Sequence, residues 1–151
     1  WRQEPQKGKT QLEYNRRYYQ EILDVVKAYK DYSILGHLDV IKRYDLNGEI
    51  ELEKIKDLIE QIFEVVIADG KGIELNTSSR AYHLKSLMPS REILELYHDM
   101  GGKIITIGSD AHNADRVGDR VMESQKILKE IGFNGIYTFD QMKPKFHEFK
   151  F

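Results

Sequence analysis

Apolar residues along this chain form two kinds of pattern that alternate, namely helical spacing and short continuous runs. Spacing of three and four residues, typical of a helix with one buried face, marks four segments. These are Thr10–Lys30, Leu52–Val66, the stretch from Ser90 through Met100, and the stretch through Val117, Val121, Leu128 and Ile131. Short apolar runs predict strands at Tyr32–Gly36, Ile73–Asn76, Lys103–Ile107 and Gly135–Phe139. Because helices and strands alternate, the pattern favours an α/β fold with parallel strands and right-handed crossovers.

Individual residues indicate where elements begin and end. Ser90 is typical of a helix N-cap, and Gly101 with Gly102 stops the helix that follows. In the first helix we expect one buried stripe, made of Tyr18, Ile22, Val25, Val26 and Tyr29. The segment Phe146–Phe151 is aromatic and basic. We expect it to need a partner surface in order to be ordered.

The composition narrows the classes of partner. The net charge of −2 gives no electrostatic reason to expect nucleic acid or a membrane surface as a partner. The chain has no cysteine, which excludes a thiol nucleophile, a cysteine-ligated zinc site and disulfides, and is consistent with the cytoplasmic location that we expect. The chain opens at Trp1 with a polar, charged segment, so we expect it to be a piece of a longer protein.

Polar side chains that can bind metal follow three of the predicted strands. His37 and Asp39 come after the first strand, Glu74 and Asn76 end the second, and the Ser109–His112 segment follows the third. In barrels and open α/β sheets, functional sites form at the carboxyl ends of parallel strands. The spacing within the second strand places Glu74 and Asn76 on one face. We therefore expect the site at this edge.

Two of these segments contain a possible pair of metal ligands. His37 with Asp39, and Asp110 with His112, each combine an imidazole and a carboxylate two residues apart, which suits zinc, iron or manganese. A structural alternative is that His37 ends its strand and Asp110 caps the following turn. The pattern by itself leaves both interpretations open.

The same segments resemble the motifs of histidinol-phosphatases in the PHP (polymerase and histidinol phosphatase) superfamily. Gly36–Tyr44 resembles their Gly-His-x-Asp motif, Ile73–Arg80 their Glu-x-Asn-Thr-Ser segment, and Ile107–His112 their Ser-Asp-Ala-His motif. The order and spacing agree, so the resemblance covers nearly the whole chain. It implies the C-terminal part of a distorted (β/α)7 barrel with flanking helices, with residues 1–151 as the C-terminal portion of a single domain.

The resemblance also implies roles for individual residues. His37, Asp110 and His112 would be the metal ligands and the centre of catalysis. Asp39 and Glu74 would support these ligands without binding the metal.

A second group of residues would bind the substrate. Arg80 and Arg43 are the candidates for the phosphate, since arginine makes bidentate contacts with it, and Asn76 is a further substrate-binding candidate. Arg43 could instead pair with Asp45 at the surface.

The reaction that the resemblance implies is metal-dependent hydrolysis of L-histidinol phosphate, a small phosphorylated metabolite, in histidine biosynthesis. The metal ions would lower the pKa of a water molecule, and the resulting hydroxide would attack the phosphorus in line. The family's His-x-His motif is absent, so we expect a minority of the ligand set and roughly half of the barrel. We expect His83, His98 and His147 to be structural or solvated.

Two alternatives remain open. The chain could belong to a related hydrolase, of the PHP or amidohydrolase type, that acts on another phosphoester. It could also be a non-catalytic fragment that binds metal weakly or not at all. Half a barrel exposes sheet edges and apolar surface, which favours pairing with a second copy. We therefore expect a homodimer.

Three other segments lack residues that the motifs they resemble require. Asp45–Gly48 hints at a calcium loop, but an EF-hand register would put Arg43 and Lys54 at ligand positions, so a turn is expected. Gly70–Gly72 lacks the Gly-Lys-Ser/Thr ending of a P-loop. The hydroxyls of Thr77–Ser79 are not set in a Gly-x-Ser-x-Gly motif, which argues against a serine hydrolase.

Overall fold

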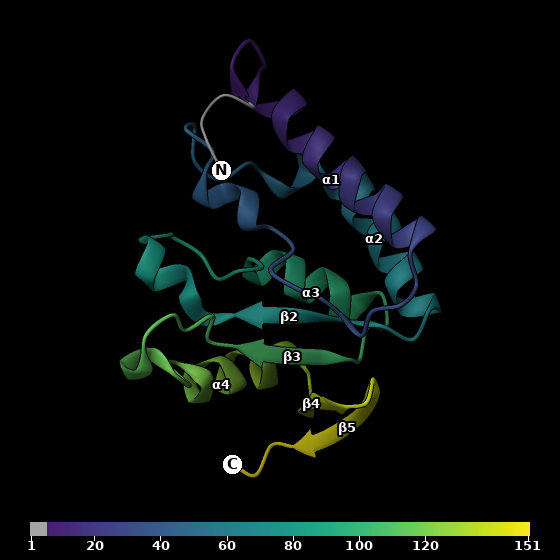
Figure 1. Ribbon diagram of the computed structural model, residues 1–151, viewed down its shortest axis with the longest axis vertical. Coiled ribbons are helices and arrows are strands. Elements are labelled where there is room, and N and C mark those ends of the chain that lie inside the picture. The colour runs from purple at the N-terminus through teal and green to yellow at the C-terminus, as the bar shows by residue number, and fades with distance from the viewer. Residues whose placement is uncertain (1–5) are drawn as a thin grey trace.

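The structure is a computed structural model, and it describes residues 6–151. These residues form four α-helices and five β-strands, with short 3-10 helices in the connections. In chain order the elements are α1 (Gln11–Ala28), β1 (Ile34–Leu35), η2 (Val40–Arg43), η3 (Leu52–Lys54), α2 (Lys56–Ala68), β2 (Gly72–Asn76), η4 (Thr77–Tyr82), α3 (Arg91–Asp99), β3 (Ile105–Gly108), η5 (Ala114–Arg116), α4 (Val121–Ile131), β4 (Gly135–Asp140) and β5 (Lys143–Glu148). In Figure 1 the N-terminal helices lie in the upper part, the parallel strands in the middle and the β4–β5 hairpin at the bottom.

Strands β1, β2 and β3 form a parallel sheet with β2 in the middle. The register pairs Ile73 with Ile105 and Asn76 with Gly108. Strand β2 is buried at every position except Glu74, as expected for a central strand covered on both faces. The predicted parallel arrangement is confirmed for these three strands, and the fold is mixed α/β.

Helices α1 and α2 lie side by side and pack on one another at one end of the molecule (Figure 1). A capping box between Thr10 and Glu13 fixes the start of α1, because each side chain accepts a hydrogen bond from the other residue's backbone N–H. The apolar face of α2, which includes Ile59 and Phe63, is fully buried in the common core.

The buried face of α1 differs from the predicted stripe. Val25 is 59% exposed and Tyr29 is 55% exposed, whereas Tyr19 and Leu23 are buried. Helix α1 ends at Ala28, and α2 packs against a face rotated by about one residue, since a helix advances about 100° per residue. The prediction was wrong for Val25 and Tyr29 and correct for Val26, which is buried.

The prediction that the last strand is parallel was wrong. Strand β4 pairs antiparallel with β5 in a separate two-stranded sheet. The chain reverses at Gln141 and Met142, which both have positive φ, as in the tight two-residue turns that match the twist of a hairpin.

The partner surface that the segment Phe146–Phe151 needs comes from the chain itself. Its first part belongs to β5, and the Phe149 backbone N–H donates to the Asn134 carbonyl. The partner of this segment is β4 of the same chain.

The helix expected through Val117 begins later, at Val121. Val117 lies outside it and is 75% exposed. Gly118 and Arg120, both with positive φ, separate η5 from α4. The predicted turn at Asp45–Gly48 is confirmed: the Asp45 side chain accepts from the Asn47 N–H, and Gly48 has a positive φ.

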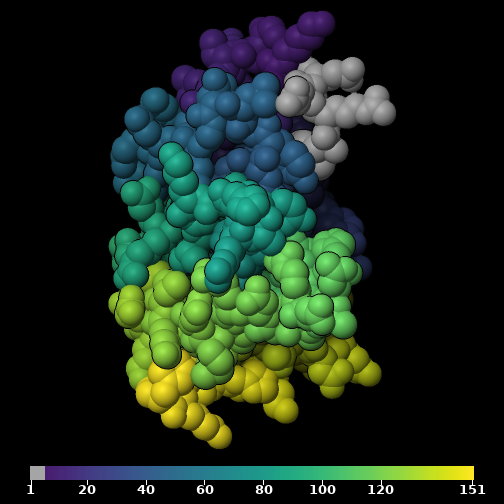
Figure 2. Space-filling model, turned by 90° about the vertical axis from the view of Figure 1, so that its left-hand side faces the viewer, coloured from purple at the N-terminus to yellow at the C-terminus, as the bar shows by residue number. Residues whose placement is uncertain are grey.

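The three parallel strands point the same way, so their carboxyl ends share one face. The connections that leave these ends carry residues 36–45, 77–90 and 109–120, and Figure 2 looks onto this side of the molecule. Within residues 6–151, no helix has both the length and the apolar character needed to cross a bilayer.

Candidate functional site

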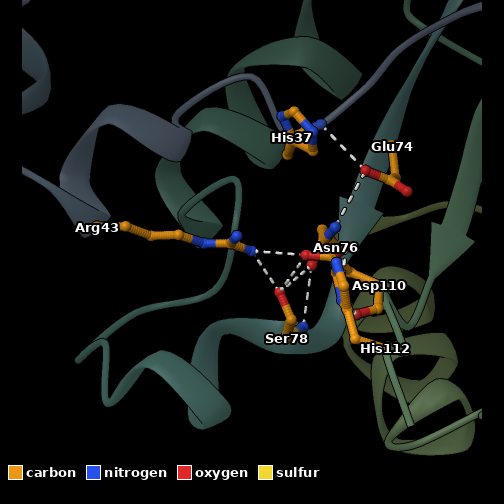
Figure 3. Close-up of polar contacts among 7 residues, drawn as sticks. All are labelled: His37, Arg43, Glu74, Asn76, Ser78, Asp110 and His112. Carbon is orange, nitrogen blue, oxygen red and sulfur yellow. Dashed lines mark hydrogen bonds and ion pairs between the residues drawn. The ribbon is translucent and has the colours of Figure 1, made fainter. Parts of the chain in front are cut away.

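Polar side chains from three connections converge at the carboxyl edge of the parallel sheet (Figure 3). The first connection and η2 supply His37 and Arg43, the end of β2 and η4 supply Glu74, Asn76 and Ser78, and the segment after β3 supplies Asp110 and His112. This is the edge at which the sequence placed the site.

Asp110 lies at the centre of the contacts. Its Oδ2 is 3.1 Å from Arg43 Nη2 and 3.2 Å from Ser78 Oγ. Burial by itself would raise the pKa of the Asp110 carboxyl, but the hydrogen bonds from Arg43 and Ser78, with the Arg43 charge, hold that pKa below its ordinary value. Asp110 also has a φ of +50°, a left-handed conformation that non-glycine residues adopt mainly where the surroundings require it.

Arg43 is almost completely buried, with 7% of its side chain exposed. Its Nη2 donates to Ser78 Oγ as well as to Asp110, and its guanidinium lies 3.8 Å from the centroid of the Tyr82 ring. Its Nε is buried without a hydrogen-bond acceptor.

The alternative pairing of Arg43 with Asp45 is wrong. Asp45 Oδ2 instead accepts from the side chains of Asn15 and Gln11, which join the turn to α1.

Glu74 supports the backbone of the first connection. Its Oε2 accepts from the His37 N–H at 3.0 Å and from Asn76 Nδ2 at 3.3 Å. A Cβ at Gly108 would collide with Glu74 Oε1, so a glycine is needed beside this carboxylate. The contact of Glu74 with His37 is made through the backbone, and it leaves the imidazole ring free of this restraint.

Ser78 and Asn76 link the carboxylate of Asp110 to the end of β2. Asn76 Oδ1 accepts from the Ser78 N–H and lies 2.5 Å from Ser78 Oγ. Because the Ser78 hydroxyl has one proton, it donates to either Asn76 or Asp110 at a given moment. Ser78 is the serine of the Glu-x-Asn-Thr-Ser segment, but its contacts and those of Tyr82 could not be predicted, because they depend on residues more than thirty positions away.

Asp39 lies away from this cluster, in a buried ion pair with Lys42. The Lys42 Nζ is 2.8 Å from Asp39 Oδ2 and also donates to Ser86 Oγ and the Leu87 carbonyl. The same Asp39 oxygen accepts from the Ser90 N–H. Burial raises the pKa of Asp39, and the opposing effect of Lys42 does not fully offset it. The pair fastens η2 to the segment before α3.

The two histidines of the site differ in their restraints. His112 Nδ1 is 2.9 Å from the Asp110 carbonyl oxygen, which can only accept, so Nδ1 is the donor of this contact and Nε2 is the ring nitrogen that could bind a metal. The ring is 75% exposed. His37 has a φ of +28° and is also exposed.

The donor set fits part of a metal site. Among the residues that the structure describes, no three histidine, aspartate, glutamate or cysteine side chains lie close enough to hold a metal ion. His112 Nδ1 lies 3.8 Å from Asp110 Oδ1, but Arg43 and Ser78 occupy the other oxygen of Asp110. The predicted ligands share one edge without forming a closed site.

Arg80 is not drawn into the Asp110 cluster. It lines a neighbouring hollow of about 670 Å³ together with four other basic residues, which are His83, Lys85, Arg91 and Arg120. The remaining histidines lie elsewhere: His98 packs against Phe133, and His147 contacts Thr138 Oγ1 in the hairpin.

Comparisons with known proteins find relatives among histidinol-phosphatases. The chain is 35% identical over 118 residues to a probable histidinol-phosphatase of Thermotoga maritima, which covers 78% of this chain and 48% of that protein. It is 30% identical over 138 residues to the histidinol-phosphatase of Lactococcus lactis, covering 89% and 51%. The chain thus spans about half the length of these curated relatives.

Solved structures agree at the level of the fold. A crystal structure of the Lactococcus lactis histidinol phosphate phosphatase, in complex with zinc, L-histidinol and phosphate, superimposes with a TM-score of 0.80 at 28% identity, covering 94% of this chain and 54% of that one. A putative histidinol phosphatase of Listeria monocytogenes gives a TM-score of 0.65 at 16% identity, over 77% and 45%. The model of the PHP domain matches residues 1–78, half of the sequence, and the chain therefore belongs to the PHP family.

Proposed function

We propose that this chain is part of a metal-dependent phosphomonoesterase that hydrolyses L-histidinol phosphate to histidinol and phosphate. The observation that carries this proposal is the likeness of 94% of the chain to an enzyme crystallised with zinc, L-histidinol and phosphate. The carboxyl edge of the sheet supplies side chains of the kinds that this chemistry needs, namely imidazole, carboxylate and guanidinium groups. Residues 1–151 would then be the C-terminal portion of a single barrel domain.

In this proposal His37, Asp110 and His112 bind metal. The chain contains no His-x-His pair, so we place the remaining ligands in the half of its relatives' length that it does not span. A bound divalent ion would activate a water molecule and polarise the phosphoryl oxygens. Zinc, iron and manganese all accept this donor set.

The other residues of the site would act on the substrate directly. Arg43 is close enough to Asp110 to reach a phosphoryl group bound beside that carboxylate, and its planar fork matches phosphate oxygens. Arg80 would contact the phosphate from the side of the basic hollow. Asn76 and Ser78 would hold the Asp110 carboxylate and the Arg43 guanidinium in position through their hydrogen bonds.

Phosphate release tests this proposal. The protein of which this chain is part is purified and loaded separately with zinc, iron and manganese, and phosphate release is measured with L-histidinol phosphate and with a panel of unrelated phosphomonoesters. The proposal predicts release from L-histidinol phosphate at a rate at least about tenfold above the panel, the effect of about 1.4 kcal/mol of preferential transition-state binding. Equal rates across the panel would favour another PHP hydrolase.

A second candidate is a non-catalytic chain that associates with a copy of itself. The observation that favours it is the lack of a closed three-ligand metal site among residues 6–151. Strand β1 also lies at the edge of the parallel sheet, and unpaired edges favour association between strands. Sedimentation would show a dimer, and the same sample would contain no stoichiometric metal and release no phosphate. A monomer that turns over substrate would exclude this candidate.

A further inference from the structure

The contacts of Arg43 do not match those of a side chain that only binds phosphate. If Arg43 serves only to bind phosphate, its guanidinium should point at an open position. It instead lies against the Asp110 carboxylate, 3.1 Å from Oδ2, with only 7% of its side chain exposed (Figure 3). The carboxylate that the proposed function assigns to a metal ion therefore already has a cation beside it.

A guanidinium and a divalent ion would compete for this carboxylate. Both are attracted by the same negative charge, and a metal ion next to Asp110 would lie within a few ångströms of the Arg43 charge. Like charges at that distance repel strongly where water is largely excluded. Binding of a metal at Asp110 is thus expected to weaken the Arg43 contact, and the Arg43 contact to weaken binding of the metal.

The surroundings of Arg43 favour movement over a permanent bond. Its Nε is buried without an acceptor, so one donor of the guanidinium is unused in this position, which is unfavourable for a charged group. The Tyr82 ring, at 3.8 Å from the guanidinium carbon, attracts the cation without fixing its direction in the plane of the ring. Arg43 also ends the short helix η2, where the backbone has little helical reinforcement.

We propose that Arg43 is an internal counter-ion, which neutralises Asp110 until a divalent cation displaces it and which then turns to the phosphate of the substrate. This inference rests on the proposed function, because it takes Asp110 as a metal ligand. It adds a second role to Arg43 and a reason for the burial of this side chain.

Zinc affinity tests the proposal without any assay of turnover. Zinc binding is measured by competition with a chromophoric chelator for the wild-type chain and for Arg43→Gln, Arg43→Lys and Asp110→Asn. Arg16→Gln is the matched control, because it removes an arginine from another Arg–Asp pair, with Asp57, and changes the net charge equally. Circular dichroism and urea unfolding confirm that each variant is folded.

The proposal predicts that Arg43→Gln binds zinc about tenfold more tightly than the wild type, as expected when a partly buried competing charge is removed. Arg43→Lys keeps the charge but loses the planar fork, so its gain should be smaller. Arg16→Gln should change the affinity by less than about twofold, because its charge is screened at the surface. Asp110→Asn should lose the binding.

A second titration tests whether Arg43 contacts phosphate once zinc is bound. Inorganic phosphate is added to the zinc-loaded wild type and to zinc-loaded Arg43→Gln, and binding is followed by calorimetry. Weaker phosphate binding by the variant, despite its tighter zinc, is the expected pair of results. Equal phosphate affinity would overturn this contact.

Other outcomes separate this proposal from the proposed function. If Arg43→Gln binds zinc as the wild type does, or more weakly, the counter-ion role is wrong while the metal site stands. If Arg43→Gln and Arg16→Gln gain equally, the effect is one of net charge and the specific role of Arg43 is wrong. If neither the wild type nor Arg43→Gln binds zinc, Asp110 is not a metal ligand in this chain, and both proposals fail here.

Discussion

Two neighbouring residues, Lys42 and Arg43, form buried ion pairs of opposite character. Lys42 pairs with Asp39, and its ammonium group also donates to Ser86 and to the Leu87 carbonyl. Arg43 pairs with Asp110, with Ser78 between them, but its Nε has no acceptor. The Lys42 ammonium group thus has three hydrogen-bond acceptors, whereas one N–H group of the Arg43 guanidinium has none.

The pKa values of the two carboxylates also differ in direction. Burial raises the pKa of Asp39, while Arg43 and Ser78 lower that of Asp110 against the effect of burial. Asp39 is fully enclosed, and its contacts tie one connection to another. Asp110 is 22% exposed at the open edge of the sheet. We infer that the first pair is structural and that the second is available for ligand exchange.

The largest effect is expected where the enclosed pair is broken. Lys42→Met leaves Asp39 buried without its partner and should lower the free energy of unfolding by about 3–5 kcal/mol, measured by urea titration. The surface pair of Lys54 and Glu51 supplies the control, and Lys54→Met should cost less than about 1 kcal/mol. Equal losses in the two variants would contradict the distinction.

The pH dependence of Lys42→Met adds a second check. Without Lys42, the pKa of Asp39 in the folded state should rise further above its unfolded value. Such a group destabilises the fold as pH rises from the unfolded pKa through the folded one. The stability of Lys42→Met should therefore recover as the pH is lowered towards about 4, the ordinary pKa of an aspartate.

A smaller effect is expected when the exposed-edge pair is broken. Asp110→Asn leaves the buried Arg43 without its counter-charge, but the amide oxygen that replaces the carboxylate still accepts from Arg43 Nη2, so the loss should be about 1–3 kcal/mol in urea unfolding. The pKa of Asp110 is lowered in the folded state, so its contribution is fully present above the unfolded pKa. The difference between wild type and variant should shrink as pH falls through the folded pKa, opposite in sign to the behaviour at Asp39.

Removal of the hydroxyl between the two charges should have a still smaller effect. Ser78→Ala deletes a donor to Asp110 and an acceptor for Arg43, and should cost about 0.5–1.5 kcal/mol. It should also raise the pKa of Asp110, which a titration followed by NMR of the carboxyl carbon would show. Ser79→Ala, one residue away, is the control. An unchanged Asp110 pKa in Ser78→Ala would mean that the hydroxyl donates only to Asn76.

The smallest effect is expected at the aromatic ring. Tyr82→Leu removes the cation–π contact with Arg43 but keeps an apolar surface, and should cost about 0.5–1 kcal/mol. Tyr82 is 44% exposed, so loss of packing contributes little. Thermal unfolding of Tyr82→Leu in the background of Arg43→Gln gives the control: the ring should then make no measurable difference.

The sequence was sufficient to predict the three parallel strands and the convergence of polar side chains at their carboxyl ends. Strands β2 and β3 are apolar runs that end in polar residues, and this pattern depends on neighbours in the chain. Pairing of β4 with β5 could not be predicted in the same way. The turn between them, Gln141–Met142, has none of the glycine or asparagine residues that usually mark a hairpin.

The partners within the site were harder to predict than its position. Arg43 and Asp110 are 67 positions apart, and nothing near Arg43 in the sequence distinguishes Asp110 from Asp45 as its partner. Burial of Lys42 depends on the segment before α3, which folds back over η2. Both contacts follow from how the connections meet above the sheet, which is a tertiary property.

We propose that the carboxyl edge of the parallel sheet binds a metal ion through Asp110 and His112. The most direct measurement is the zinc content of the purified chain, by mass spectrometry, beside His112→Ala and the hairpin control His147→Ala. We expect zinc in the wild type and in His147→Ala, and its loss in His112→Ala. Equal zinc in all three chains, or none in the wild type, would contradict it.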